Sequence, residues 1–472
     1  MSPEIAIVAY GIGILGLFLL ERDQSSRVSK ALWIPVAWLW IIGSRPVSQW
    51  LDMAPVTNSP DTYLDGSPLD RAVFGALLVA GLIVLFRRGR EVATLLRSNW
   101  PILLFFSYCA VSAIWSDYPD VAFRRWVKGL GDVVMVLVVL TDANPSAAIK
   151  RLLARVGLVL LPASVLLIKY YPDLGRAYTP EFGYWQAMYT GVTPSKNSLG
   201  GLALIFGLAA VWQLTDLFQD KESSNRRRRI LVQVTILGIV SWIFWTANSI
   251  TSLSCFLLGA AVIIITRVWP RFRRPILVHT LVLAVLCSSI FAVFIAPDLL
   301  SVVGRDPTLT GRTQIWTVVL DMPVNRAIGT GFESFWLGER MQRIWNLWWW
   351  HPNEAHNGYI EVLLNLGWIG ICLLALVLLK GYRSVIFALR RHRSIASLEL
   401  AYLLAAVIYS FTEAGFRMLG LIWIFLLLAI TAARVQLPET QTETIDQYGD
   451  NRAEREMALG QDAWSRPELE SF

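Results

Sequence analysis

Residues 359–379 read YIEVLLNLGWIGICLLALVLL, an apolar run broken only by Glu361, Asn365 and the two glycines Gly367 and Gly370. A transmembrane helix needs about 20 consecutive, mostly apolar residues, so this run is long enough to cross a bilayer. Similar runs recur along all 472 residues of the chain, of which 55% are hydrophobic and 16% charged. A soluble protein carries about 25% charged residues. The composition therefore predicts an all-α polytopic membrane protein, and it excludes a soluble enzyme, a disordered chain and a nucleic-acid-binding protein.

Apolar windows divide the chain into about 12 or 13 transmembrane helices separated by polar loops. We expect these helices at residues 4–20, 31–50, 70–86, 100–116, 127–140, 152–168, 198–218, 230–246, 250–266, 275–296, 357–379, 396–412 and 418–433. Together they form one transmembrane domain over residues 1–433. The polar and charged segment 434–472 predicts a disordered cytoplasmic tail.

The distribution of Lys and Arg predicts the orientation of the chain. Half of the 42 fall in alternate, mostly short loops, namely at Arg22, Arg27 and Lys30, at Arg87, Arg88 and Arg90, at Lys150 and Arg151, at Arg226 to Arg229, at Arg267, Arg271, Arg273 and Arg274, and at Lys380, Arg383, Arg390, Arg391 and Arg393. The positive-inside rule places these loops in the cytoplasm. The other loops, including the long one at residues 297–356, then face outward. The net charge of +7 is explained by the excess of Lys and Arg in the cytoplasmic loops.

The long outer loop 297–356 is the segment where we expect the chemistry. It contains an aromatic run at Trp345, Trp348, Trp349 and Trp350. Tryptophan is common where a helix meets the membrane surface, so an interfacial belt is the ordinary interpretation of this run. The alternative interpretation is a platform on which sugar rings stack.

His356 ends this loop, where the next helix begins. An imidazole near neutral pH can accept a proton in a transition state, and activity would then fall below an unperturbed pKa of about 6.5. The structural alternative is an interfacial histidine bonded to backbone. Gly367 and Gly370, further along the same helix, would let another helix approach closely.

The spacing of His356-Asn357, nine residues and then Gly367-Trp-Ile-Gly370 resembles the O-antigen ligase and polysaccharide polymerase superfamily. The resemblance covers about residues 100–433. Three further segments, Leu309 to Trp316, Gly329 to Trp336 and Thr193 to Gly200, are similar to the exopolysaccharide-production polymerase branch of that superfamily.

This resemblance implies a glycosyltransferase of the GT-C-like, multi-helix membrane architecture with one long periplasmic loop. Its donor would be a glycan on undecaprenyl pyrophosphate in a bacterial inner membrane, and its acceptor a second glycan or a lipid A core. Other polysaccharide export proteins are expected partners, and no cofactor is expected. A sugar leaving from a pyrophosphate needs cations on the phosphates and one base for the acceptor hydroxyl.

Arginine and histidine of the outer loop supply both functions. We assign His356 as the base and Arg312 as the pyrophosphate clamp, both catalytic. The substrate-binding candidates are Arg305, Lys196, Asn197 and Asn357.

Two features of the phosphate site depart from the usual patterns. Many relatives carry a basic residue in the tight outer hairpin, where this chain has Asn248-Ser249-Ile250-Thr251, so one cation is missing. In the first outer loop, Asp52, Asp61, Asp65 and Asp70 are scattered rather than paired. We therefore expect no metal.

The sequence leaves three functions open. The first is a polymerase that joins lipid-linked repeat units, and the second is a ligase that moves a finished glycan onto lipid A core or protein. The third is a transporter or flippase of lipid-linked sugars. A transporter is expected to place ionisable residues in the middle of its spans, whereas here only a few acids, such as Asp132, Glu361 and Glu413, approach the apolar regions. An enzyme at the membrane face is therefore favoured.

Overall fold

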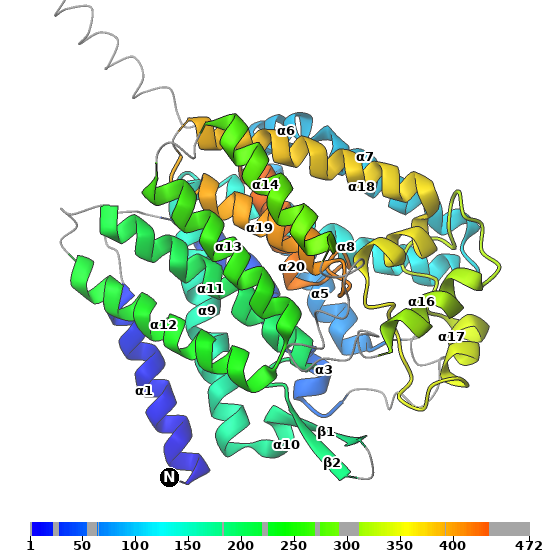
Figure 1. Cartoon of the computed structure of the whole chain (residues 1–472), viewed down its shortest axis with the longest axis horizontal. Coiled ribbons are helices and arrows are strands. Elements are labelled where there is room, and N and C mark those ends of the chain that lie inside the picture. The colour runs from blue at the N-terminus through cyan, green and yellow to red at the C-terminus, as the bar shows by residue number, and fades with distance from the viewer. Residues whose placement is uncertain are drawn as a thin grey trace, which may run out of the picture. The chain divides into compact units, whose positions relative to one another are not determined.

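The computed structural model of the chain describes residues 2–21, 28–53, 64, 66–181, 184–219, 225–269, 274–291, 311–391 and 393–433. Arg305 and the predicted tail 434–472 lie outside these residues. The described elements, in chain order, are α1 (Pro3–Glu21), η1 (Lys30–Leu32), α2 (Trp33–Ile42), α3 (Val47–Trp50), α5 (Pro68–Arg87), α6 (Gly89–Ser98), α7 (Trp100–Ser112), η2 (Ala113–Trp115), α8 (Pro119–Leu140), α9 (Pro145–Tyr170), α10 (Pro172–Gly175), β1 (Arg176–Glu181), β2 (Tyr184–Tyr189), α11 (Lys196–Gln219), α12 (Arg226–Ala247), α13 (Ile250–Val268), α14 (Pro275–Ile290), α16 (Arg312–Asp321), α17 (Gly338–Trp345), α18 (Gly358–Arg390), α19 (Ala396–Tyr409) and α20 (Leu421–Ala432) (Figure 1).

Each segment expected to cross the membrane contains a helix, but the one expected at 31–50 is broken, since α2 ends at Ile42 and α3 begins at Val47. Among the described residues, seven helices are long and apolar enough to span a bilayer, or eight if the bent pair α6–α7 forms one span. Shorter apolar helices occupy four further expected positions, at Lys30–Ile42, Pro275–Ile290, Ala396–Tyr409 and Leu421–Ala432. The chain is an all-α polytopic membrane protein.

Two local elements were not expected from the apolar pattern. The polar helix α6 precedes α7 and is bent from it by 88°. The chain leaves the helical conformation at Asn99, with φ −114° and ψ 34°, and Pro101 in the first turn of α7 has no N–H with which to continue the hydrogen bonding of α6. In the outer segment between α10 and α11, β1 and β2 form an antiparallel hairpin in which Arg176 pairs with Tyr189. Short polar elements of this kind do not produce an apolar run.

Side-chain contacts join segments predicted on the same side of the membrane. On the predicted outer side, Arg45 donates to the carbonyl oxygens of Thr193 and Gly191, each at 3.3 Å. On the predicted cytoplasmic side, the Asp216 carboxylate accepts from Lys150 at 3.0 Å and from Arg267 at 2.7 Å. These contacts agree with the alternation of loops derived from charge.

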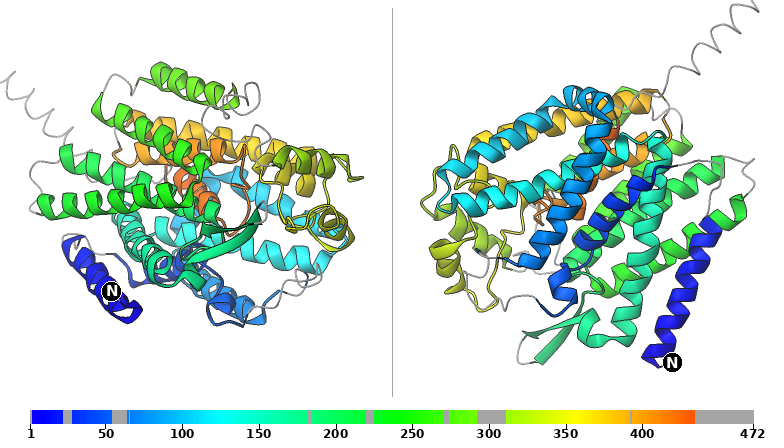
Figure 2. Two further views of the ribbon diagram at one scale, coloured as in Figure 1. Left: turned by 60° about the horizontal axis from the view of Figure 1, so that its bottom comes forward. Right: turned by 180° about the vertical axis from the view of Figure 1, so that it is seen from behind.

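Helix burial identifies the centre and the edge of the bundle. All twelve residues of α20 are buried, and α19 is almost as enclosed. By contrast, only 6% of α1 is buried, and it packs at the edge against α9 and α12 (Figure 2). The loop that precedes α18 packs at the end of the central helices that is predicted to face outward.

A break in α18 anchors this loop. Gly367 has φ 66° and ψ −166°, which interrupts the helix. The backbone N–H groups of Thr330 and Gly331 donate to the carbonyls of Leu364 and Asn365 at 3.0 and 2.8 Å. In the other direction, the N–H of Trp368 donates to the carbonyl of Arg326 at 2.9 Å. The hydrogen bonds that the helix loses at the break are therefore made with the loop.

The glycines at this junction permit a close backbone approach. A Cβ at Gly367 would lie 2.3 Å from the carbonyl carbon of Ala327, and a Cβ at Gly329 would lie 2.4 Å from that of Asn365. We expected another helix to pack closely against Gly367, and that prediction was wrong because the segment that packs there is not a helix. A turn of the loop at residues 326–328 packs there, because the break exposes backbone groups that only another backbone can satisfy at that distance.

The described part of the outer segment, from residue 311 to α18, has a small core of its own. Ile315 and Val319 of α16 pack with Phe335, Trp336 and Ile344, together with Ala355 and Leu364. Figure 1 shows α16 and α17 beside the outer end of α18. This packing fixes the two ends of the segment, Arg312 and His356, relative to each other.

Candidate functional site

Arg312 and Glu413 form the first ion pair of the site. Arg312 is the first residue of α16 and follows Gly311, whose φ of 78° turns the chain into the helix. Its Nη2 lies 2.6 Å from Glu413 Oε1, and its Nη1 donates to the carbonyl oxygen of Thr412. The Arg312 side chain is 16% exposed and that of Glu413 is 5% exposed. The guanidinium is therefore held from one side and open on the other.

His356 lies on the second oxygen of the same carboxylate. Its Nδ1 is 3.3 Å from Glu413 Oε2 and 2.9 Å from Glu354 Oε1. Because both carboxylates face Nδ1, Nε2 is the ring nitrogen left to face another group. His356 has φ 50°, a conformation that costs about 1–3 kcal/mol for a residue other than glycine and persists only where the surroundings impose it.

Arg417 extends this arrangement beyond Glu354. Its Nη1 lies 3.3 Å from Glu354 Oε2, and its Nε lies 3.4 Å from Glu333 Oε2. Burial disfavours the charged guanidinium, but Glu333, Glu354 and Glu361 raise the pKa of Arg417 above its usual range. The site is thus an alternating series of charges, in the order Arg312, Glu413, His356, Glu354, Arg417 and Glu333.

The charges change the protonation of His356. Burial alone would lower the pKa of the imidazole, but Glu354 and Glu413 raise it to about 9. Burial would likewise raise the pKa of Glu354, but His356, Arg417 and Arg312 lower it to about 2. At neutral pH His356 is therefore an imidazolium between two carboxylates, and the unperturbed pKa assumed from the sequence does not apply.

Two buried tryptophans, Trp336 and Trp345, and the partly buried Trp316 hold the backbone around His356. Trp316 Nε1 donates to the carbonyl of Ala355 at 2.7 Å, and Trp345 Nε1 donates to that of Pro352 at 3.1 Å. Trp336 Nε1 donates to both oxygens of Glu361 at 3.0 Å. One of these oxygens also accepts from the Ala355 N–H at 2.5 Å.

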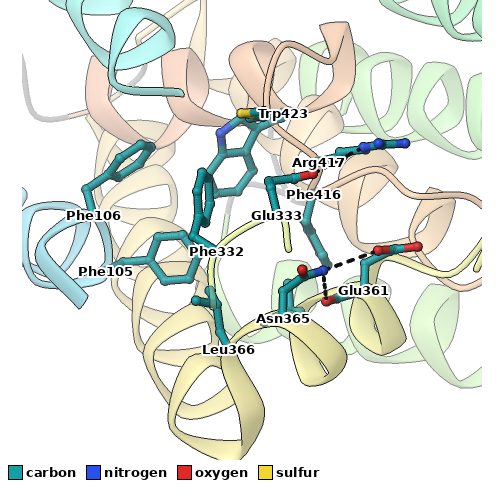
Figure 3. A pocket seen from close by; sticks show the side chains of 12 residues that line it. Phe105, Phe106, Phe332, Glu333, Glu361, Asn365, Leu366, Phe416, Arg417 and Trp423 are labelled. Carbon is teal, nitrogen blue, oxygen red and sulfur yellow. Dashed lines mark hydrogen bonds and ion pairs between the residues drawn. The ribbon is translucent and has the colours of Figure 1, made fainter. Parts of the chain in front are cut away.

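A small cavity of about 30 Å³ adjoins the charged series. Figure 3 shows the aromatic side chains Phe105, Phe106, Phe332 and Trp423 on one side of it, and Glu333, Arg417, Glu361 and Asn365 on the other. The cavity therefore runs from an apolar wall contributed by α7 and α20 to the guanidinium of Arg417. Its lining is apolar at one end and charged at the other.

The same residues include a group of metal-ligand type. One nitrogen of His356 and one oxygen each of Glu354 and Glu413 lie within 4.8 Å of one another. However, the other oxygen of Glu413 is bonded to Arg312, and the other oxygen of Glu354 to Arg417. Two neighbouring cations oppose the binding of a third at these carboxylates.

The remaining predicted site residues have different positions. Lys196 begins α11, and the main-chain oxygen of Asn197 accepts from the Tyr409 hydroxyl at 3.4 Å. Asn357 is 4% exposed, and its side chain caps α18 by accepting from the N–H groups of Tyr359 and Ile360. Its amide nitrogen also donates to the carbonyl of Phe411 at 2.9 Å. These contacts give Asn357 a structural function in place of the substrate contact that we expected.

The tight hairpin that lacks a cation lies next to Arg312. Thr251 Oγ1 is 2.9 Å from Thr412 Oγ1, and the carbonyl of Thr412 is the one that accepts from Arg312. The hairpin therefore reaches the site through hydroxyl groups. Arg417, which lies in the connection between α19 and α20, is a candidate to replace the cation that the hairpin lacks.

The sequence did not identify Arg417, and it noted Glu413 only as an acid near an apolar segment. Both lie in the short connection between α19 and α20, where a charged pair between two very apolar helices is itself a signal of function. Asn365 was also missed; its Oδ1 accepts from the N–H groups of Ser334 and Phe335 at 2.8 and 3.0 Å and so fixes the loop that carries Glu333.

Comparison with known proteins agrees with this geometry. Residues 186–375 match the O-Antigen ligase family, a range that contains both Arg312 and His356. The chain is also 24% identical over 298 residues to the exopolysaccharide production protein ExoQ of Rhizobium meliloti (strain 1021). That alignment covers 60% of this chain and 64% of the relative, so it spans less than two thirds of the curated protein. By these two matches the chain is similar to the O-Antigen ligase family over residues 186–375 and to an exopolysaccharide production protein over 298 residues.

Proposed function

We propose that this membrane enzyme is a glycosyltransferase that polymerises exopolysaccharide, taking a glycan from undecaprenyl pyrophosphate and joining it to a second lipid-linked glycan at the periplasmic face. The observation that carries the proposal is the shared carboxylate of Glu413, which holds Arg312 and His356 at 2.6 and 3.3 Å. A cation for phosphates and a proton acceptor for a hydroxyl are thereby placed side by side.

The donor fits the cation-rich and apolar parts of the site. Arg312 offers the open edge of a planar guanidinium, which binds phosphate oxygens through two parallel hydrogen bonds. Arg417 stands at the polar end of the aromatic cavity and provides a second cation. The pyrophosphate then lies between these two arginines, and the first part of the prenyl chain lies along the phenylalanines.

The acceptor hydroxyl is activated at His356 Nε2. The acceptor oxygen attacks the anomeric carbon of the donor sugar, the bond from that carbon to the pyrophosphate oxygen breaks, and undecaprenyl pyrophosphate leaves with the electron pair. The hydroxyl proton passes to Nε2 of the imidazole in its neutral form, which is the minor form at neutral pH because the pKa of His356 is about 9. Glu354 and Glu413, which accept from Nδ1, stabilise the imidazolium that forms, as a carboxylate does in other histidine–carboxylate pairs.

We expect the reaction to need no metal, because guanidinium groups already neutralise Glu354 and Glu413. Transfer by the purified enzyme should therefore be unchanged in excess EDTA. Loss of transfer in EDTA that added Mn²⁺ or Mg²⁺ restores would contradict this point.

A ligase is the second candidate, because the matched family is described as O-antigen ligase. It would use the same donor and base with a different acceptor. A transporter is less well supported. Its most suggestive residue, the buried Asp132 of α8, accepts from Trp38 Nε1 and from the Leu419 N–H, both at 2.9 Å, and so serves packing.

Reconstitution of the purified protein with the lipid-linked oligosaccharide of its own strain separates these functions. A ladder of longer products without any other acceptor is expected for a polymerase. Product that forms only after lipid A core is added would identify a ligase. No transfer under either condition, with intact folded protein, would contradict the proposed enzyme.

A further inference from the structure

The four tryptophans of the outer loop separate into two groups in the structure. Trp345 is buried and stacks on the ring of His351, with centroids 4.4 Å apart. Trp348 packs against the small outer core. Trp349 and Trp350, by contrast, are 64% and 41% exposed. The first two are therefore structural, and the last two have surface free for another molecule.

Trp350 is directed toward the reactive end of the site. Its ring centroid lies 6.4 Å from that of His356, and the two planes are tilted by 36°. The backbone between them begins and ends with left-handed residues, since both His351 and His356 have φ 50°. Two such strained residues in six positions are held by the indole hydrogen bonds of Trp316 and Trp345 to Ala355 and Pro352. The fold thus imposes the proximity of the two rings.

We propose that Trp350 is the platform on which the sugar ring of the acceptor stacks while its hydroxyl lies at His356. This inference rests on the proposed function, because it assumes that His356 accepts the acceptor's proton. A sugar ring has faces of C–H groups and edges of hydroxyls. An aromatic plane matches such a face, and the neighbouring imidazole and carboxylates match the hydroxyl edge.

The position of Trp350 favours a sugar over a lipid as its partner. The ring neighbours the imidazole and its two carboxylates, an environment in which an acyl chain would desolvate charges without replacing their hydrogen bonds. A glycan brings hydroxyl groups to the same place. Trp349, one residue earlier and more exposed, is the matched control for a tryptophan that contacts the membrane surface.

The test compares acceptor kinetics of three variants in nanodiscs. As acceptor it uses oligosaccharide released from the strain's own polysaccharide. Trp350→Ala should raise the acceptor KM about tenfold, the effect of losing one aromatic stacking contact. The donor KM and the turnover at saturating acceptor should stay within about twofold. Trp350→Phe should recover most of the loss, and Trp349→Ala should match the wild type.

Binding measured without turnover separates this inference from the proposed function. In a His356→Ala background, calorimetric titration with the same oligosaccharide should show affinity that falls about tenfold when Trp350→Ala is added. If the protein transfers no sugar but this loss is seen, the function fails and the platform stands. An unchanged acceptor KM and affinity in Trp350→Ala, or equal defects in Trp349→Ala and Trp350→Ala, would identify a membrane contact and overturn the platform.

Discussion

Arg312 and His356, 44 residues apart in the chain, are bound to opposite oxygens of one carboxylate, that of Glu413. The Arg312 Nη2–Glu413 Oε1 distance is 2.6 Å, and the His356 Nδ1–Glu413 Oε2 distance is 3.3 Å. Any ligand that draws Arg312 away from Glu413 leaves more negative charge facing the imidazole. In the proposed function, in which the donor binds Arg312, donor binding and the basicity of His356 are therefore coupled through a single side chain.

Replacement of Arg312 by lysine should abolish most activity while the protein still folds. An ammonium is a point donor and cannot reproduce the two parallel hydrogen bonds of a guanidinium to phosphate, although it can still pair with Glu413. The measurement is kcat/KM for the lipid-linked donor. Arg343→Lys, at the exposed ion pair with Glu339 in α17, is the control and should have little effect. Arg305→Lys should be milder than Arg312→Lys. A fully active Arg312→Lys enzyme would remove Arg312 from the site.

Replacement of His356 by alanine should reduce turnover by about 10²- to 10⁴-fold, the usual contribution of a general base. His351→Ala is the control, because His351 stacks on Trp345 and does not face the carboxylates. Insertion into the membrane and donor binding should remain in both variants. Near-normal turnover of His356→Ala at saturating donor would assign the base to another group, with Glu354 or Glu333 as the next candidates.

The pH profile should follow the raised pKa of His356. The imidazole is a free base only above its pKa of about 9, so kcat/KM should rise from pH 6 toward pH 9 as the proton is lost. Glu413→Gln removes one of the two carboxylates that raise this pKa, so the rise in kcat/KM should occur at lower pH. An activity that is flat or falls between pH 7 and 9 would mean that the imidazolium itself is the active form, as a third cation for phosphate.

Alanine at Gly367 or Gly329 should destabilise the outer half of the protein. A Cβ would lie 2.3 to 2.4 Å from backbone carbon at either position, and both residues have positive φ. We expect a melting temperature in detergent lower by several degrees, since a ΔΔG of 1 kcal/mol shifts Tm by about 2–4 °C in a domain of 150–250 residues, and activity should be lost in parallel. Gly11→Ala in α1 is the control, with no described atom within 4 Å of the added carbon. Wild-type stability of Gly367→Ala would show that the break in α18 is not required.

Cysteine labelling tests the membrane orientation. After replacement of Cys109, Cys255, Cys287 and Cys372, a cysteine at Asn225 should resist an impermeant reagent in intact spheroplasts, and one at Leu347 should react. The reason is the cluster Arg226 to Arg229, which belongs in the cytoplasm by the positive-inside rule. Labelling at position 225 from outside would reverse the topology and remove the periplasmic site.

Periodicity and composition were sufficient to locate the helices, because a bilayer demands long apolar segments whatever their neighbours are. They were less informative where a helix is short or broken. The apolar run at 359–379 gives no sign that Gly367 leaves the helical conformation, since that break depends on the backbone of residues 326–331 docking against it. The hairpin of β1 and β2 is likewise absent from the apolar pattern.

Arg312 and His356 could be proposed as site residues from the sequence alone, because each is a residue type that the proposed chemistry requires and each lies in the longest loop predicted to face outward. The arrangement of these two residues in space could not be predicted from the sequence. Glu413 and Arg417 come from the connection between α19 and α20, and only the packing of α19 and α20 against α18 brings them to the loop. The sequence by itself determined a membrane bundle with a histidine and an arginine outside it. The tertiary structure decided the charge of the histidine, because the protonation of His356 depends on carboxylates that are distant in the chain and close in space.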